Sequence, residues 1–367
     1  MFSFVFLLNL LVVYLPLLFI GYFMPNFTRK TLLFGIVIPE EVNDNEEVLK
    51  IKKSYKRNYG LSSIGIAMIL SAISIKTQNV DYLNYGVLIL VANMSVNYLY
   101  AHNKSKLLKK EKGWVQNKKQ VVIVDTSHRY NQKYLSYHWF WIPIGIIAFT
   151  TVFTMIQYPY LPSKVPIHFD LYGNITNYTN KSFLSVFGLP LTQIGMTVLF
   201  YIIYRVIQNV RPSIQASMPK TSLKQNQIAK RYWAIYMLVT SVIINIQFAY
   251  IQLNVLQITD PKSKVSFLIY GLSVFVPIVG AILVAIKTGQ SGSRIKIDHE
   301  EEINNKVIDR DDDRFWKWGM FYYNPDDPNL HVEKRFGIGW TINFGRPAGM
   351  AIMIILVISI AVSIILS

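Results

Sequence analysis

Cysteine is absent from the chain, and charged residues are scarce. The missing cysteines exclude disulfides, thiolate catalysis and metal sites with cysteine ligands. Only 16% of the 367 residues are charged, whereas an ordinary soluble domain carries about 25%. Because 52% of the residues are hydrophobic, the composition excludes a disordered chain and disfavours a soluble two-domain enzyme of this length.

Acidic residues are also in short supply. The chain has 21 Asp and Glu against 37 Lys and Arg, which gives a formal net charge of +16. Such an excess is typical of proteins that bind nucleic acid, lie on a membrane surface, or cross a membrane with a defined orientation. The positions of the basic residues decide between these classes.

Long apolar runs dominate what is present. A helix that crosses roughly 30 Å of hydrocarbon needs about 20 apolar residues. Eight runs approach or reach this length, at residues 2–23, 60–75, 82–101, 138–156, 183–207, 232–256, 265–286 and 347–366. We therefore predict an all-α polytopic membrane protein with about eight transmembrane helices and a small cytoplasmic β-containing unit.

Two of the eight runs differ from the rest. Residues 60–75 make only about 24 Å of helix at 1.5 Å per residue, so Arg57 and Lys76 would have to extend this span by snorkelling. Residues 2–23 have no basic segment before them and exceed the usual length of a signal-peptide core. We therefore predict that they form a retained transmembrane helix.

The basic residues alternate between the connecting loops. Loops 24–59, 102–137, 208–231 and 287–346 hold 31 of the 37 basic residues, the other connections hold five, and Arg205 ends a span. The positive-inside rule places these four loops in the cytoplasm and both termini outside. All seven tryptophans lie on the same predicted side, which favours either contact with the inner membrane surface or a small Trp-containing folded unit.

Ionisable side chains are missing from the interiors of the predicted spans. This disfavours a proton-coupled pump and an intramembrane protease, which place such groups within the membrane. Neutral polar residues remain, chiefly Asn93, Asn97 and Asn245. They indicate either hydrogen bonds between helices or a polar pathway through the membrane.

The longest outside loop, residues 157–182, has the proline and glycine content of turns and not of a helix. A compact motif within it consists of Pro166, His168, Phe169, Asp170, Gly173 and Lys181. Alternation along an extended stretch places His168 and Asp170 on one face. This arrangement predicts either a capped loop in which His168 bonds to the backbone or a ligand-binding loop.

Enzymatic chemistry has little support in the same loop. One histidine and one aspartate are too few for a structural metal site, which takes about four ligands. A catalytic Ser-His-Asp triad could use Ser163, Ser182 or Ser185, but the spacing of these residues does not support one. We expect no metal, no cofactor and no catalysis, and a membrane enzyme that uses His168 and Asp170 remains the third alternative.

The motif Pro-x-His-Phe-Asp-x-x-Gly, followed by Lys181, resembles the signature of the SdpI-like family of bacterial integral membrane proteins. The similarity covers roughly residues 140–205. It implies a multi-pass protein of the bacterial plasma membrane with this loop outside. For immunity members of the family, it implies recognition of a secreted peptide and recruitment of a transcriptional repressor to the membrane. The chain departs from the resemblance in its larger number of predicted spans.

The last cytoplasmic loop contains an acidic segment, residues 298–313. Its carboxylates could bind a divalent cation, but their spacing does not match a calcium-binding loop, and we interpret the segment as a solvated linker. An aromatic segment follows, and we predict two or three short strands joined by a tight turn at 324–328. It resembles a module of uncharacterised bacterial membrane proteins, with Asn324, Asp326, Asp327, Lys334, Arg335 and Trp340 as its candidate residues. Its aromatic and basic faces would rest against the inner leaflet.

Three further inner segments complete this unit. We expect a strand over residues 119–126, an extended segment over 33–41 and a charged amphipathic helix over 42–58. The leading functional hypothesis is a binding, immunity or signal-sensing protein whose outside loop recognises a peptide or envelope ligand. Its expected partners are the lipid bilayer, a secreted peptide and a cytoplasmic regulator, with no nucleic acid. The alternative is a transporter or an accessory subunit of one.

Overall fold

The structure is a computed structural model that describes residues 2–114, 119–121, 135–170, 173–297 and 307–366. It is mostly helical, and six of its helices are long and apolar enough to cross a membrane. This confirms a multi-pass helical membrane protein. Two of the eight predicted spans are not among these six helices, so eight crossings are not confirmed.

The two missing spans have different causes. Residues 82–101 lie in helix α4 (Asp81–Lys112), where Asn84, Asn93 and Asn97 lower the mean hydropathy of the apolar run. Residues 347–366 form helix α10 (Pro347–Leu366), which is apolar along its length but enters the comparison only over Pro347–Ser359, a shorter range than the other six helices have.

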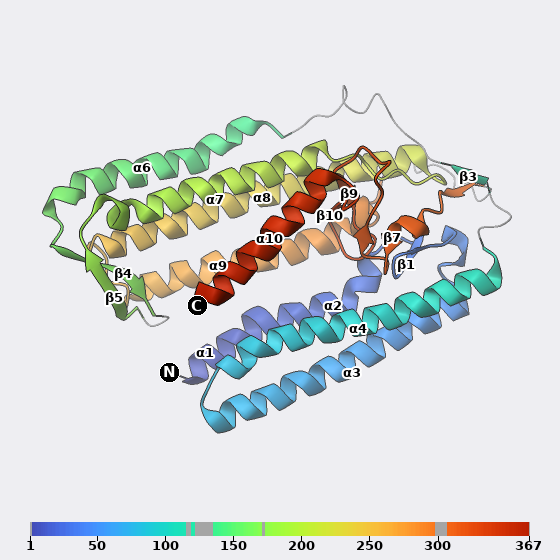
Figure 1. Ribbon diagram of the computed structural model, residues 1–367, viewed down its shortest axis with the longest axis horizontal. Helices are drawn as coiled ribbons and strands as arrows, with labels where there is room; N and C mark the ends of the chain where they lie inside the picture. The colour runs from blue at the N-terminus through green and yellow to red at the C-terminus, as the bar shows by residue number, and fades with distance from the viewer. Residues whose placement is uncertain (1, 115–118, 122–134, 171–172, 298–306, 367) are drawn as a thin grey trace. The chain divides into compact units, whose positions relative to one another are not determined.

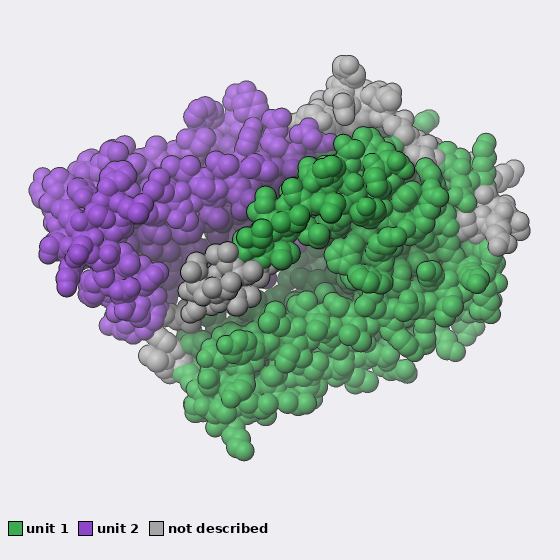
Figure 2. Space-filling view, in the orientation of Figure 1, with its two compact units in different colours: residues 1–132, 210–230, 282–367 green, residues 133–209, 231–281 purple. Residues whose placement is uncertain are grey.

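The chain divides into two compact units, which Figure 2 colours separately. Unit 1 comprises Met1–Gln132, Val210–Lys230 and Ile282–Ser367, and unit 2 comprises Lys133–Asn209 and Arg231–Ala281. Helices α8 (Pro219–Val255) and α9 (Lys264–Thr288) each have residues in both units.

Unit 1 begins with helices joined without loops. Helices α1 (Phe2–Asn9) and α2 (Leu15–Phe27) are continuous through a π-helical turn over Leu10–Tyr14. Helix α3 (Glu46–Thr77) then runs antiparallel to α4, and the two lie side by side (Figure 1). The predicted charged helix 42–58 begins only at Glu46 and continues through the short span 60–75, so that the two form one helix of 32 residues. This helix contains an apolar stretch long enough to cross a membrane.

The strands of unit 1 are short and lie in separate two-stranded sheets. Antiparallel pairs join β1 (Leu32–Leu33) to β2 (Ile36–Val37), β7 (Trp316–Lys317) to β8 (Phe321–Tyr322), and β9 (His331–Glu333) to β10 (Trp340–Ile342). The parallel pair joins β3 (Lys119–Val121) to β6 (Val307–Asp309). The predicted strand 119–126 is thus observed over 119–121, and its remainder lies outside the described residues.

The core of unit 1 joins these strands to the helices. Phe34 sits at the turn of the β1–β2 hairpin, and its carbonyl oxygen accepts a hydrogen bond from the hydroxyl of Tyr98 on α4 at 3.1 Å. The ring of Phe34 also packs against that of Tyr55 on α3, with centroids 4.9 Å apart. Gly35 has a φ of +83° and approaches Gly319 so closely that a Cβ would lie 2.8 Å from it. A glycine is therefore required on geometric grounds.

Unit 2 contains α6 (Trp141–Gln157), α7 (Phe183–Asn209) and the adjoining parts of α8 and α9. A 3-10 turn over Tyr137–Phe140 precedes α6, and the outside loop folds as a hairpin of β4 (Lys164–Phe169) and β5 (Ile175–Asn180). The expected extended stretch at His168 is thus part of a strand, and the pairing of this strand with a second one was not predicted.

Candidate functional site

The β4–β5 hairpin is attached to the helices of unit 2 by one apolar face. Val165 on β4 is fully buried and packs with Val186 and Phe187 of α7 and with Leu256 after α8. Pro166 is also buried, next to Val165. The strands are antiparallel, and their register shifts on either side of His168. Such an irregularity bends a strand and redirects its side chains.

Asp170 and Gly173 shape the turn between the strands. The carboxylate of Asp170 accepts hydrogen bonds from the backbone N–H of Asn174 at 2.8 Å and from its side-chain amide at 2.7 Å. Gly173 has a φ of +75°, and a Cβ there would lie 2.4 Å from the carbonyl oxygen of Pro261. The turn thus depends on a glycine that rests against the connection between α8 and α9.

Lys181 closes the base of the hairpin. Its ammonium group donates to the carbonyl oxygens of Leu161 at 3.1 Å and Pro159 at 3.4 Å. The same group lies 4.8 Å from the centre of the Tyr158 ring. Pro166, Asp170, Gly173 and Lys181 therefore have structural tasks in this loop.

His168 is the exposed member of the motif, with Phe169 half-buried beside it. The nearby serines Ser182 and Ser185 cap the start of α7, because each hydroxyl accepts the other residue's backbone N–H. Within the described residues, no group of three or more His, Cys, Asp or Glu could hold a metal ion.

The C-terminal module is organised around Asn343, which belongs to the sequence motif but is not one of the predicted candidate residues. Asn343 is fully buried, and its side-chain amide donates to the carbonyl oxygens of Asn324 at 2.8 Å and Asp327 at 3.2 Å. Its side-chain oxygen accepts the N–H groups of Asn324 and Gly345, each at 3.0 Å. One side chain thereby holds the 324–328 turn against the start of α10.

Asp327, one of the predicted turn residues, adds further hydrogen bonds around Asn343. The carboxylate of Asp327 accepts the Tyr322 hydroxyl at 2.9 Å and the Asn329 N–H at 3.0 Å, while Asp326 is exposed. The turn connects β8 to β9, and these strands are partners of β7 and β10 respectively. Short strands therefore flank the predicted turn, but there are four of them, paired as two hairpins that a bridge between Tyr322 and Asn343 connects.

Arg335 connects the module to the rest of unit 1. It is 5% exposed, donates to the Gly35 carbonyl oxygen at 2.8 Å and forms ion pairs with Asp312 and Asp313. Lys109 on α4 pairs with Asp313 at 2.6 Å. Burial acts to raise the pKa of Asp313, but Arg335 and Lys109 outweigh it and lower that pKa. The solvated-linker prediction was therefore wrong for residues 311–313, while residues 298–306 lie outside the described part.

A second buried charge pair is formed by Arg29 and Glu333. Their side chains are 9% and 10% exposed, with 3.9 Å between Nη2 and Oε2. Arg29 also donates to the Ser213 hydroxyl at 2.8 Å. Burial raises the pKa of Glu333, and the Arg29 charge opposes this shift. Neighbouring Lys334 is exposed, and half-buried Trp340 pairs with Glu333 across β9 and β10.

The polar residues of the helices form hydrogen bonds. The Asn93 amide donates to the Ser63 hydroxyl on α3 at 2.8 Å, and the Asn97 amide donates to the Asn93 carbonyl oxygen at 2.9 Å. In unit 2, the Asn245 amide donates to the Thr197 hydroxyl on α7 at 2.8 Å.

Two family models match parts of the chain. Residues 145–194 match a Domain of unknown function (DUF1648), and residues 325–350 match a Family of unknown function (DUF5808). Both are uncharacterised membrane-associated families, consistent with a bacterial membrane protein. The first match covers the hairpin with parts of α6 and α7, and the second covers the segment that Asn343 organises. No curated protein and no solved structure matches the chain.

Proposed function

We propose that the chain is an SdpI-like membrane protein that binds a peptide or envelope ligand outside the cell through the β4–β5 hairpin. The observation that supports this best is the exposure of the hairpin. Of the six residues in β5, five are exposed and Thr179 is half-buried. A two-stranded hairpin has two edges, and an extended peptide can add to such an edge through backbone hydrogen bonds.

The side chains on this hairpin fit the proposal. Tyr178 is 53% exposed and Ile175 is 38% exposed, with His168 exposed on the facing strand. Because Asp170 and Lys181 hold the turn and base of the hairpin, its strands are presented on a fixed support. Tyrosine provides a large amphipathic contact surface, which is common at binding sites.

The C-terminal module is assigned to the cytoplasmic face. Trp318 and Phe321 at the β7–β8 turn are 65% and 44% exposed, and exposed Lys317 and Arg314 lie beside them in the sequence. Aromatic and basic residues together suit the interface of an anionic leaflet. We propose that this face rests on the inner leaflet and that a cytoplasmic regulator binds next to it.

A protection assay tests the binding function. Peptide-sensitive bacterial cells that express the chain would be challenged with a panel of secreted peptide toxins, and we expect survival against at least one. The double variant His168→Ala/Tyr178→Ala should lose that protection while its abundance in the membrane is unchanged. Tyr100→Ala is the matched control, since Tyr100 is 51% exposed on α4. Equal killing with and without the chain across the panel would count against the proposal.

Transport is the second candidate, and one observation favours it. The side-chain oxygens of Gln193, Asn245 and Gln252 are buried in unit 2 without a hydrogen-bond partner in the described part of the chain. Because the chain has no cysteine, Asn245→Cys provides a unique thiol. Labelling of this thiol by a small hydrophilic reagent would indicate a water-filled pathway, whereas complete protection would indicate a closed helix bundle.

A further inference from the structure

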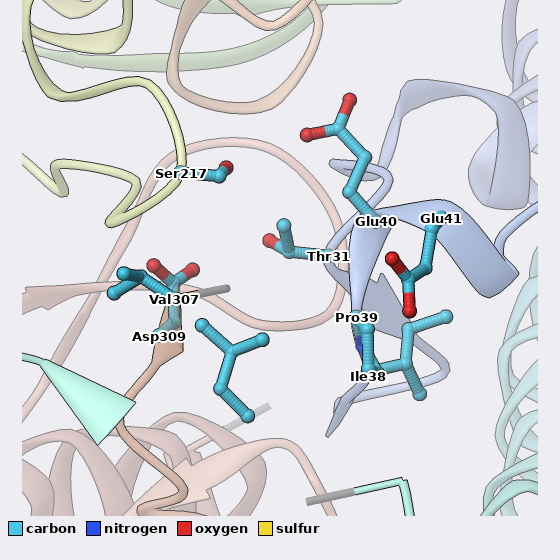
Figure 3. Close-up of a pocket in the computed structure, with 9 residues that line it drawn as sticks. Thr31, Ile38, Pro39, Glu40, Glu41, Ser217, Val307 and Asp309 are labelled. Atoms are coloured by element: carbon cyan, nitrogen blue, oxygen red, sulfur yellow. The ribbon is translucent and has the colours of Figure 1, made fainter. Parts of the chain in front are cut away.

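Two spaces in the fold differ greatly in size. Figure 3 shows the smaller one, a polar cavity of unit 1 whose lining includes Thr31, Glu40, Ser217 and Asp309. It measures about 10 Å³, which is room for roughly one water molecule. The larger one is a groove in unit 2 of about 560 Å³, a volume typical of sites for organic ligands. This groove is independent of the function proposed above for the β4–β5 hairpin.

The groove lies between helices α6 and α7, which run side by side in opposite directions (Figure 1). Its lining includes Trp141, Ile144 and Ala148 on α6, and Ile194, Val198 and Tyr201 on α7. These residues recur every three or four positions, so they share one face of each helix. The ring of Phe140, just before α6, packs on the rings of Tyr201 and Tyr204 with centroids 5.2 and 5.1 Å apart. The start of α6 is therefore attached to the end of α7 beside the groove.

The groove is apolar and belongs to segments that cross the membrane by length and composition. Tyr137–Tyr160 and Phe183–Asn209 are two of the six such segments. A groove of this kind opens to lipid chains at membrane depth and not to water. An empty space beside its side chains would forfeit dispersion contacts. We therefore expect an apolar chain to fill it.

Distances along α7 place the groove within one leaflet. About 33 Å of helix separate Phe183 from Arg205 at 1.5 Å per residue, which is close to the roughly 30 Å thickness of the hydrocarbon core. Because Phe183 directly follows the outside hairpin, Arg205 lies at the level of the head groups on the other side. Ile194 lies about 16 Å before Arg205 along the helix, near the centre of the bilayer. The groove thus extends over the depth of one acyl chain.

Arg205 lies beside the head-group end of the groove. Its guanidinium group is 6.0 Å from the centre of the Tyr201 ring and donates to the Tyr201 hydroxyl at 3.4 Å. The acidic residues of unit 2 are Asp170 and Asp260. Both lie at the opposite end, Asp170 in the hairpin turn and Asp260 in the α8–α9 connection that this turn contacts. Arg205 is exposed, and unit 2 offers its remaining N–H donors no carboxylate.

An anionic phospholipid matches both the apolar groove and the charge at its end. We propose that the groove binds one acyl chain of such a lipid, whose phosphate accepts hydrogen bonds from the guanidinium group of Arg205. Guanidinium and phosphate form paired, charge-assisted hydrogen bonds. Exposed Arg231 lies one turn before Ala234, which packs with Tyr204, so a second cation is at the same end of the unit. A zwitterionic lipid would bring an ammonium group to this end, where unit 2 has no carboxylate to receive it.

Native mass spectrometry of the full-length protein in detergent tests the proposal. Dioleoylphosphatidylglycerol and dioleoylphosphatidylcholine have the same acyl chains and differ in charge, and each would be added separately. We expect the wild type to retain one phosphatidylglycerol molecule with an affinity about fivefold higher than that for phosphatidylcholine, the effect of one basic residue near an anionic lipid. Arg205→Gln should abolish this preference, and Arg205→Lys should keep part of it. Lys164→Gln, at an exposed position of β4, is the matched control and should keep all of it.

A substitution that fills the groove tests the acyl-chain contact. Ala148→Phe adds a ring at an exposed lining position and should cause a loss of both lipids. Val152→Phe is the matched control, since Val152 is 56% exposed on the same helix but does not line the groove. If Ala148→Phe does not fold, Val198→Phe, at another exposed lining position, replaces it.

Three results would overturn the proposal. Equal retention of the two lipids by the wild type, or an unchanged preference in Arg205→Gln, would mean that Arg205 does not select an anionic head group. Full lipid retention in the groove-filling variant would mean that the lipid binds elsewhere. A dimer that Ala148→Phe abolishes and Val152→Phe retains would mean that a second copy of the chain fills the groove.

Discussion

Asn343 and Asn324 bond to each other in both directions, with the Asn343 amide donating to the Asn324 carbonyl oxygen and its side-chain oxygen accepting the Asn324 N–H. Replacing Asn343 with alanine removes both hydrogen bonds and leaves buried backbone groups without partners. We expect Asn343→Ala to lower the free energy of unfolding by at least about 2 kcal/mol. Thermal unfolding in detergent measures the change. Asp326→Ala at the exposed tip of the turn should have little effect, and equal losses for the two variants would refute the central role of Asn343.

Gly173→Ala should damage the outside hairpin. The new methyl group would lie 2.4 Å from the Pro261 carbonyl oxygen, at a backbone conformation unfavourable for alanine. We expect a lower Tm and faster proteolysis between β4 and β5. Gly195→Ala on α7 is the matched control, because nothing lies within 4 Å of its Cβ position and alanine favours a helix. Similar proteolysis rates for both variants would contradict the close contact with Pro261.

Arg335→Met should destabilise unit 1 strongly. It leaves Asp312 and Asp313 without their buried partner and the Gly35 carbonyl oxygen without its donor. Breaking a buried ion pair from one side typically costs about 3–5 kcal/mol. Exposed Arg314→Met should change the free energy of unfolding by less than about 0.5 kcal/mol. Chemical denaturation in detergent separates these outcomes, and a loss for Arg335→Met no larger than that control would contradict the network.

The lowered pKa of Asp313 predicts a particular acid response. Since its folded-state pKa lies below the unfolded value, the ionised carboxylate stabilises the protein above the unfolded pKa. This stabilisation is lost as the pH falls through the folded pKa. The stability difference between the wild type and Asp313→Asn should therefore be constant near neutral pH and shrink below about pH 4. A difference independent of pH would show that the charge of Asp313 is not involved.

Cysteine labelling tests the proposed orientation. Single substitutions Tyr160→Cys, beside the hairpin, and Asp326→Cys, in the C-terminal module, introduce thiols at exposed positions into a chain that has none. In intact cells, an impermeant maleimide should label the first and not the second, and permeabilisation should expose both. The reverse pattern would invert the assignment from the positive-inside rule.

The sequence predicts the helical membrane architecture well because apolar length is a local property. Residues 60–75 looked too short since the pattern cannot show that a charged helix continues from Glu46 without interruption. The hairpin was missed because Pro166 and Gly173 indicate turns locally, whereas the pairing of Val165 with Thr179 depends on contacts across the loop. Strands of one to three residues, such as β1 and β7, are too short to be predicted from the alternation of apolar and polar side chains.

The same contrast between local signals and distant contacts applies to the residues of the candidate sites. The motif 166–181 was found as a pattern, but its spacing could not show that Asp170 and Lys181 shape the loop while His168 is exposed. Arg29 gave no signal, and Asn343 belonged to the C-terminal motif without being a candidate residue, since neither differs locally from an ordinary surface residue. Their importance arises from partners such as Asn324 and Glu333, and only the fold brings these together.

The contact between Arg335 and Gly35 can form only late in synthesis of the chain, because 300 residues separate the two. At about 5–20 residues per second, the ribosome needs roughly 15–60 s to reach Arg335 after Gly35. During that time the Gly35 carbonyl oxygen lacks its Arg335 donor, and Lys109 lacks the Asp313 carboxylate with which it pairs. Unit 2 is synthesised within this interval, so the membrane insertion machinery handles its helices before unit 1 can close. A chain that ends before residue 335 therefore lacks the ion pairs that Arg335 forms with Asp312 and Asp313.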